Sequence, residues 1–141
     1  MTLKDRIAAF SELGKILRDA LDGVENNFSP ELDSLINNQH LTNPWFTPGN
    51  VRSAVKAIAD ELTEGNLVSW TEAYPFLKNE TVARNVGIVM AGNIPLVGFH
   101  DFLTVLITGN NVVAKASSKD KDLIMFISGI LFSINAEFGE K

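Results

Sequence analysis

Two short Val-rich stretches, 85–91 ("NVGIVMA") and 110–116 ("NNVVAKA"), constrain the fold of this chain more than any other feature. Short continuous apolar runs with β-branched residues are typical of parallel strands that are buried on both faces. The segment between them, 94–108, is apolar nearly all round and predicts a buried helix, and 121–138 predicts another. The order strand, helix, strand, helix predicts an α/β fold with two neighbouring parallel strands.

The first eighty residues follow a helical pattern instead. Thr2, Ser29 and Thr47 each stand where a helix N-cap is expected, and a fourth helix is predicted to end before Pro75. Pro30 fits the first turn of the second helix. The first helix carries an apolar stripe with spacings of three and four residues, formed by Leu3, Ile7, Phe10, Leu13, Leu17 and Leu21.

These patterns divide the chain into a helical segment, 1–80, and an α/β segment, 81–141, with the boundary in the polar stretch 77–85. The second segment contains only two predicted strands, and a two-stranded parallel sheet cannot bury both of its faces and both of its edges. Either partner subunits complete the sheet in a homo-oligomer, or the chain is the N-terminal part of a longer protein. We expect the second arrangement.

Composition argues against several classes of protein. The net charge is −5 and no run of Lys or Arg exceeds two residues, which argues against a nucleic-acid-binding protein. The chain has no cysteine, so it lacks disulfides, thiolate metal sites and a cysteine nucleophile, and it shows no other metal-ligand cluster. The N-terminus is charged and does not resemble a signal peptide, and the longest uncharged run, 85–100, is short for a membrane span. We expect a cytoplasmic protein with no membrane span.

Asn93 is the first candidate site residue, in a Gly-Asn-X-Pro turn directly after the first predicted strand. Ligands of open α/β sheets bind outside the carboxyl ends of the strands. An Asn amide at that position can donate a hydrogen bond to a developing oxyanion. The alternative is that Asn93 caps the next helix, with Pro95 in the first turn of that helix. From spacing alone the cap is the better interpretation.

The end of the second strand supplies further candidates. Lys115 is followed by a loop of small polar residues that includes Ser117 and Ser118, a combination suited to a ribose or a phosphate. The residues alone leave two structural alternatives to such a binding role. Lys115 can extend along the surface as an ordinary strand-end lysine, and the two serines can cap the last helix.

The remaining conspicuous side chains favour structural roles. His100 and Asp101 are adjacent within a predicted helix, and neighbouring helical side chains do not face each other, so we expect a partly buried, hydrogen-bonded histidine rather than an acid–base pair. His40 lies in a polar stretch and is expected at the surface. Three large aromatic residues are expected to pack within or between helices: Trp45, Phe46 and Trp70.

The sequence from 86 to 120, "VGIVMAGNIPLVGFHDFLTVLITGNNVVAKASSKD", resembles the start of the cofactor domain in the aldehyde dehydrogenase superfamily. The shared pattern is a strand, an Asn-X-Pro turn, a buried helix ending in Gly-Asn, and a strand ending in Lys. The closer resemblance is to the acyl-CoA reductase family, which includes the fatty-acid reductase of bacterial luminescence systems. The helical leader "NPWFTPGNVRSAVKAIA", 43–59, resembles the same family.

This resemblance implies that an acyl group passes from acyl-CoA or another acyl thioester to an enzyme cysteine, and that NADPH reduces the thioester to an aldehyde. It implies that Asn93 stabilises the oxyanion and that Lys115 contacts the adenosine ribose. Many NAD-preferring relatives have Lys-Pro-Ser-Glu here, where this chain has Lys-Ala-Ser-Ser at 115–118. Because the carboxylate is missing, a 2′-phosphate would meet Ser117, Ser118 and Lys119, which favours NADPH over NAD.

The nucleophilic cysteine of the family lies downstream of the region that this chain resembles. The resemblance therefore implies the N-terminal portion of an NADP-linked acyl-CoA reductase, an oxidoreductase, and we expect this portion to be inactive alone. It would consist of a helical segment and the first βαβα of an aldehyde-dehydrogenase-like cofactor domain. The alternative is a complete, non-catalytic binding or assembly module that shares the fold.

Overall fold

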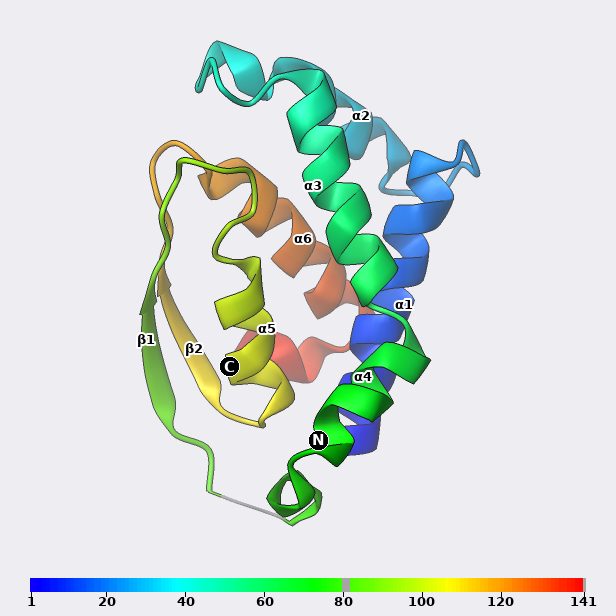
Figure 1. Ribbon diagram of the computed structural model, residues 1–141, viewed down its shortest axis with the longest axis vertical. Helices are drawn as coiled ribbons and strands as arrows, with labels where there is room; N and C mark the ends of the chain where they lie inside the picture. Colours follow the sequence, from blue (N-terminus) through cyan, green and yellow to red (C-terminus); the bar gives the residue numbers. More distant parts are fainter. Residues whose placement is uncertain (80–81, 141) are drawn as a thin grey trace.

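The computed structural model describes residues 1–79 and 82–140 and shows a mixed fold with a helical N-terminal part and a two-stranded parallel sheet (Figure 1). The predicted α/β class is confirmed at this level. The exact boundary predicted at 80 and 81 lies outside the described residues. The elements in chain order are α1 (Leu3–Leu21), α2 (Ser29–Asn38), η1 (Gln39–Leu41), α3 (Pro48–Glu61), α4 (Glu64–Glu72), η2 (Pro75–Lys78), β1 (Asn85–Val89), α5 (Phe99–Ile107), β2 (Asn111–Lys115), α6 (Lys121–Ile134) and η3 (Ala136–Glu140).

Side-chain caps set the starts of α1 and α3 where the sequence places them. Thr2 caps α1 in a capping box with Asp5, which also lowers the pKa of the Asp5 carboxyl through hydrogen bonds from Thr2. The hydroxyl of Thr47 caps α3 by accepting a hydrogen bond from the backbone N–H of Asn50. The prediction for Ser29 is wrong by one position, because Ser29 is the first residue of α2 and its hydroxyl accepts from the backbone N–H of Asn26.

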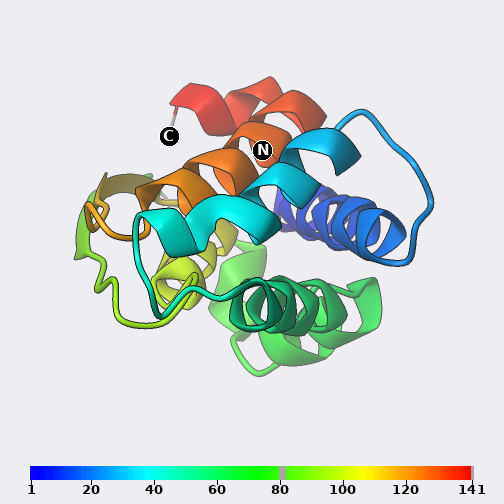
Figure 2. The same cartoon turned by 90° about the horizontal axis from the view of Figure 1, so that it is seen from above.

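Helix α1 lies between α3 and α4 on one side and α6 on the other (Figure 2). Its stripe is fully buried at Phe10 and Leu13, and the ring of Phe10 meets Phe138 edge to face at 5.6 Å. One hydrophobic cluster joins side chains of the helical segment to side chains of α5 and α6. The two segments therefore share a core.

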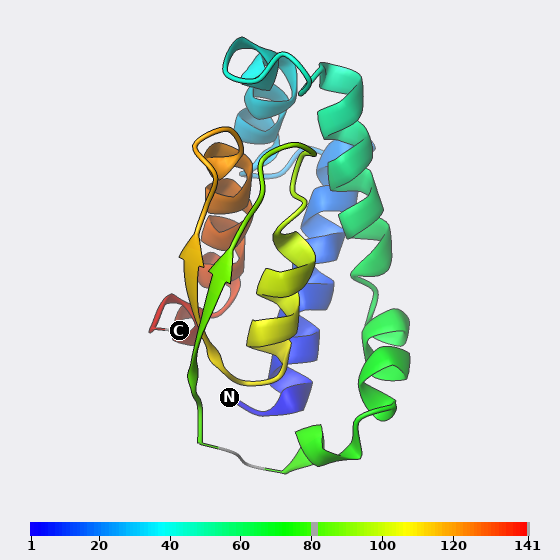
Figure 3. The same ribbon diagram turned by 60° about the vertical axis from the view of Figure 1, so that its left-hand side comes forward.

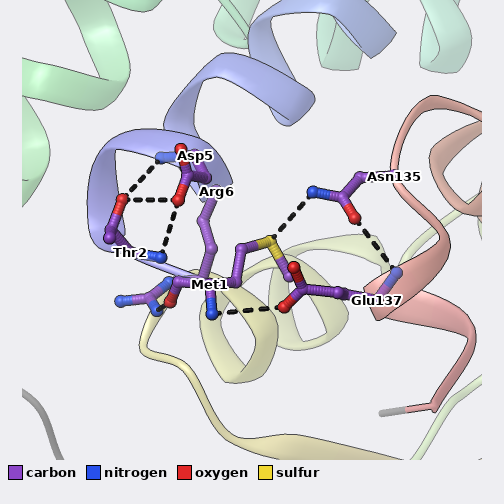
Figure 4. Close-up of polar contacts among 6 residues, drawn as sticks. All are labelled: Met1, Thr2, Asp5, Arg6, Asn135 and Glu137. Atoms are coloured by element: carbon purple, nitrogen blue, oxygen red, sulfur yellow. Dashed lines mark hydrogen bonds and ion pairs between the residues drawn. The ribbon is translucent and has the colours of Figure 1, made fainter.

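Polar contacts fix the N-terminal end of α1 on the opposite end of the chain (Figure 4). The Met1 amine lies 3.2 Å from the Glu137 carboxylate. The guanidinium of Arg6, which is buried, donates through Nε to the carbonyl oxygen of Ile107 at 2.8 Å and through Nη1 to that of Met1 at 2.7 Å. Burial lowers the pKa of Arg6. These bonds satisfy a buried charge and hold the end of α5 against α1.

Strands β1 and β2 pair in parallel, from Asn85 opposite Asn111 to Val89 opposite Lys115. Helices α5 and α6 cover the same face of this sheet (Figure 3). The other face is exposed among the described residues, with Val89 80% and Val113 61% exposed. The described residues cover one face only, as expected of a sheet that has two strands. Strand β1 alternates in burial as a half-buried strand does, whereas β2 is exposed along its last three residues.

Helix α5 is shorter than the sequence predicts. It begins at Phe99 rather than at residue 94, because the four residues from Pro95 form a turn in which Leu96 adopts a positive φ of 61°. The last helix is shorter too and ends at Ile134 rather than at 138. No helix in the described part of the chain is long and apolar enough to cross a lipid bilayer.

Candidate functional site at the strand ends

Three loops meet at the carboxyl ends of β1 and β2 and line an open pocket of about 490 Å³. Figure 3 shows the loops that follow the two arrowheads, with the segment between α2 and α3 beside them. The position agrees with the general rule that ligands of parallel sheets bind beyond the carboxyl ends of the strands. The residues that line this strand-end pocket are Asn43, Trp45, Gly92, Asn93, Ser117 and Lys119.

The loop after β1 and the loop after β2 touch at Gly92. A Cβ atom at this position would lie 2.7 Å from the Cβ of Ser117 and would overlap its hydroxyl. Glycine is therefore the residue that permits the approach of the two loops. The hydroxyl of Ser117 also accepts a hydrogen bond from the backbone N–H of Lys119 at 3.3 Å, which shapes the second loop.

Asn43 joins the helical segment to this pocket. Its side chain is 4% exposed and donates through Nδ2 to the carbonyl oxygen of Gly92 at 3.1 Å. Its Oδ1 accepts from the backbone N–H of Trp45 at 3.2 Å, and its own carbonyl oxygen accepts from Phe46. One buried amide thus holds the Trp45 segment against the turn that contains Asn93.

Asp120 connects the same two loops on the core side. Its carboxylate Oδ2 accepts from the backbone N–H of Leu96 at 2.7 Å, and this contact holds the residue with positive φ. Its Oδ1 is buried and has no hydrogen-bond partner among residues 1–79 and 82–140. Burial raises the pKa of Asp120 to about 6, the bond from Leu96 opposes this rise, and the nearby Asp122 adds to it.

The structure removes the capping interpretation of Asn93. The helix that follows begins six residues later, at Phe99, and its N-cap is Gly98 without a side-chain cap. The Asn93 side chain is exposed and lines the strand-end pocket. Its amide therefore stands where it can contact a bound molecule.

The three residues proposed at the second strand end are separated. Ser117 lines the pocket, whereas Lys115 and Ser118 are exposed and are not among its lining residues. Lys115 pairs with Val89, so the two side chains lie on the same outer face of the sheet. The serines do not cap α6, whose N-cap is Asp120. Lys119 is the cation that reaches the pocket.

His100 lies elsewhere. It is exposed rather than partly buried as predicted, and its ring lies 5.8 Å from that of Trp70. These two rings border a separate pocket of about 300 Å³ between α4 and α5. His40 is exposed as predicted. Among the described residues no three His, Asp or Glu side chains gather as a metal site.

Sequence reasoning misplaced Trp45 and overlooked Asn43 and Asp120. Both aromatic residues were expected to pack within or between helices. This is wrong for Trp45, which is 78% exposed, and confirmed for Phe46, which is fully buried. A signal was present in the Asn-Pro pair before the two aromatic residues, because this pair indicates a turn rather than a helix. The role of Asp120 had no local signal, since its partner lies 24 residues earlier.

The chain matches no family model, and no curated protein or solved structure is significantly similar to it.

Proposed function

We propose that this chain is the N-terminal portion of an NADP-linked acyl-CoA reductase with an aldehyde-dehydrogenase-like cofactor domain. The observation that carries the proposal is the meeting of Asn93 with Ser117 and Lys119 in one pocket beyond the ends of two parallel strands. The pocket offers amide, hydroxyl and ammonium donors, and no carboxylate is among its lining residues. Such a donor set fits a phosphorylated cofactor and a carbonyl oxygen that becomes negative.

The roles of the residues follow from their chemistry. The amide of Asn93 would donate to the carbonyl oxygen of the bound acyl group while negative charge builds on that oxygen. Ser117 and Lys119 would hold phosphate oxygens of NADPH, which supplies the hydride when bound. Lys115, on the outer face of the sheet, would contact a cofactor only beyond the rim of this pocket. The nucleophilic cysteine would come from a later segment of the enzyme.

The test begins with the gene. We expect the reading frame to continue past the codon of Lys141 into a cysteine-containing segment. The encoded protein should oxidise NADPH in the presence of a long-chain acyl-CoA. Replacing Asn93 by Ala should lower kcat by about 10²- to 10³-fold, because one oxyanion donor contributes on this order. His100→Ala, which alters the other pocket, serves as the matched control. Unchanged turnover in Asn93→Ala would exclude the oxyanion role.

A second candidate function is a non-catalytic assembly module, and the exposed outer face of the sheet favours it. Val89, Val113 and Lys115 lie on that face, and a second copy or another protein could cover it. A stop codon after Lys141 together with a stable dimer in light scattering would support the module. A monomer that continues into a longer enzyme would exclude it.

A further inference from the structure

The pocket between α4 and α5, called the Trp70 pocket from here on, is a feature that the proposed function leaves unused. It has a volume of about 300 Å³ and shares no lining residue with the strand-end pocket. Its floor is apolar, because Leu62, Leu67 and Leu103 line it and are each at most 4% exposed. A hollow of this size with an apolar floor is large enough for a small organic molecule.

Trp70 forms an aromatic wall of this pocket. Its indole is partly buried and packs against the hydrophobic core, and its ring lies 5.8 Å from the ring of His100 with the two planes at 36°. A side chain that is already ordered by such contacts loses little entropy when a ligand binds. The face of an indole attracts a cation through the quadrupole of the ring, more strongly than tyrosine or phenylalanine does. Trp70 therefore offers an apolar contact together with a preference for positive charge.

Glu61, which also lines the Trp70 pocket, carries a charge that its own helix disfavours. Asp60 and Glu61 lie in the last turn of α3, and that turn has no basic residue. The carboxyl end of a helix bears a partial negative charge, which favours cations and disfavours carboxylates. The Asp60 carboxylate is compensated by Lys56 Nζ at 2.6 Å, whereas Glu61 forms no ion pair within residues 1–79 and 82–140. A residue that breaks a local preference without compensation is a mark of a functional position.

Asn66 adds a second acceptor at the mouth of the pocket. Its Nδ2 donates to the backbone carbonyl oxygens of Asp60 and Glu61, both at 3.3 Å, and its backbone N–H donates to the Thr63 hydroxyl at 3.2 Å. These bonds hold the residue at the start of α4, and no hydrogen bond from the described residues reaches its Oδ1. A carboxylate and an amide oxygen, both of which accept hydrogen bonds from an ammonium group, therefore stand beside the apolar floor.

We propose that the Trp70 pocket binds a small amphiphilic ammonium ion, with the apolar body of the ion over the three leucines and the charged group beside Trp70 and Glu61. An anion would meet the Glu61 carboxylate and the negative end of α3. A cation without an apolar body would leave the leucine floor uncovered. The proposal goes beyond the proposed function, because it concerns a different pocket and does not depend on the reductase reaction.

The probes for the test are isopentylammonium chloride and isopentanol, which have the same apolar body and differ in charge. The chain has two tryptophans, one in each of two separate pockets. Trp45→Phe leaves Trp70 as the only indole, and Trp70→Phe leaves Trp45 as the matched control. Intrinsic fluorescence is followed in each variant during titration at constant ionic strength, and neither probe absorbs where tryptophan is excited.

We expect a saturable change of Trp70 fluorescence with isopentylammonium, weaker binding of isopentanol, and no saturable change in Trp70→Phe. In the Trp45→Phe background, Glu61→Gln keeps the size of the side chain and removes its charge. It should weaken binding of the ammonium ion by about 2- to 5-fold, as expected of an exposed ion pair, and leave binding of the alcohol unchanged. Glu64→Gln is the matched control, because Glu64 is exposed nearby but is not a lining residue, and it should bind both probes as the parent does.

A second variant tests the aromatic wall. Trp70→Ala should weaken binding of the ammonium ion by about 2- to 30-fold through the lost cation–π contact, as measured in proton–nitrogen correlation spectra. Because Trp70 is partly buried, its unfolding midpoint is compared with that of the parent. Glu61 is exposed, so the result for Glu61→Gln holds whatever Trp70→Ala does to stability.

The inference is overturned if isopentylammonium causes no saturable change of Trp70 fluorescence, or if both tryptophans respond equally. Equal affinities for the ammonium ion and the alcohol would overturn the choice of a cation. Equal losses in Glu61→Gln and Glu64→Gln would show attraction to general negative charge and would overturn the contact with Glu61. The reductase proposal fails or succeeds separately, because its test measures turnover and Asn93→Ala in the other pocket.

Discussion

Around α1 the buried side chains are mainly apolar, whereas the strand-end loops bury an amide, Asn43, and a carboxylate, Asp120. In the first region Phe10 and Leu13 are held by close packing against other apolar side chains. In the second, Asn43 and Asp120 each join two loops through single hydrogen bonds, and one carboxylate oxygen stays unpaired among the described residues. Packing gives the molecule its stability, and the strand-end contacts give the loops their relative positions.

The difference has an energetic meaning. A non-glycine residue with positive φ costs on the order of 1–3 kcal/mol, and a buried carboxylate without full pairing adds to that cost. Leu96 and Asp120 carry both features at the place where Asn93 faces the pocket. Strain of this kind persists where the surrounding structure fixes it, and it is concentrated at functional sites. The well-packed interior around α1 supports this strained region.

The largest effect should come from the packed region. Phe10→Ala removes a fully buried ring and its contact with Phe138, and we expect a loss of about 3–5 kcal/mol in the free energy of unfolding. Leu41→Ala removes a side chain that is 75% exposed and should change this quantity by less than about 0.5 kcal/mol. Urea unfolding of both variants measures the contrast, and similar losses would contradict the assignment of the core.

The next effect depends on pH and comes from Asp120. Because burial raises its pKa from 3.8 to about 6, the folded state binds a proton that the unfolded state has released. This group therefore stabilises the fold less as pH rises through that window, by about 3 kcal/mol in total. Asp120→Asn should not show this change, and its amide oxygen can still accept from Leu96.

The measurement for Asp120 is the difference in unfolding free energy between Asp120→Asn and the parent, taken at about pH 4 and pH 7. We expect this difference to move in favour of the variant by about 2 kcal/mol between these two pH values. Asp60→Asn, at an exposed helical ion pair with Lys56, controls for the loss of a surface carboxylate. A pH-independent difference would show that Asp120 is not held in a desolvated site.

A smaller loss of stability is expected where the two strand-end loops touch at Gly92. Gly92→Ala places a Cβ atom 2.7 Å from the Cβ of Ser117, and we expect a loss of about 1–3 kcal/mol. Adding Ser117→Gly should recover much of this loss, so the double-mutant cycle should show clear coupling. Gly129→Ala, where nothing lies within 4 Å, should instead stabilise α6 by about 0.5–1 kcal/mol. Additive losses at Gly92 and Ser117 would argue against the close approach.

The smallest effect on stability is expected at Trp45. Because its indole is 78% exposed, Trp45→Ala should change the free energy of unfolding by less than about 0.5 kcal/mol. The adjacent Phe46→Ala should cost about 3–5 kcal/mol, since Phe46 is fully buried. Thermal or urea unfolding of this neighbouring pair compares an exposed aromatic side chain with a buried one. Equal losses would place Trp45 in the core.

The features that the sequence predicted correctly depend on nearby residues. The caps at Thr2 and Thr47 and the stripe of α1 follow from spacings of a few residues, and the structure has them. The parallel pairing of β1 and β2 follows from the βαβα order. The same order predicts that Asn93 lies in the loop after β1, where the structure has it.

The features that the sequence missed depend on distant contacts. Helix α5 starts late because the backbone at Leu96 is fixed by Asp120, which no local pattern shows. The strands are half-buried because their surroundings, rather than their own composition, decide what covers each face. Lys115 and Lys119 look alike in sequence, and the pairing of Lys115 with the exposed Val89 is what places Lys115 on the outer face.

We expect the strand-end pocket to be a ligand site that is built from both segments of the chain. The most direct test is a proton–nitrogen correlation spectrum of the isotope-labelled chain, titrated with adenosine 2′,5′-bisphosphate. We predict shifts of the Trp45 indole, the Asn93 side-chain amide and the Lys119 backbone amide, with the Trp70 indole unchanged. Shifts confined to Trp70 and His100, or no shifts at all, would contradict the claim.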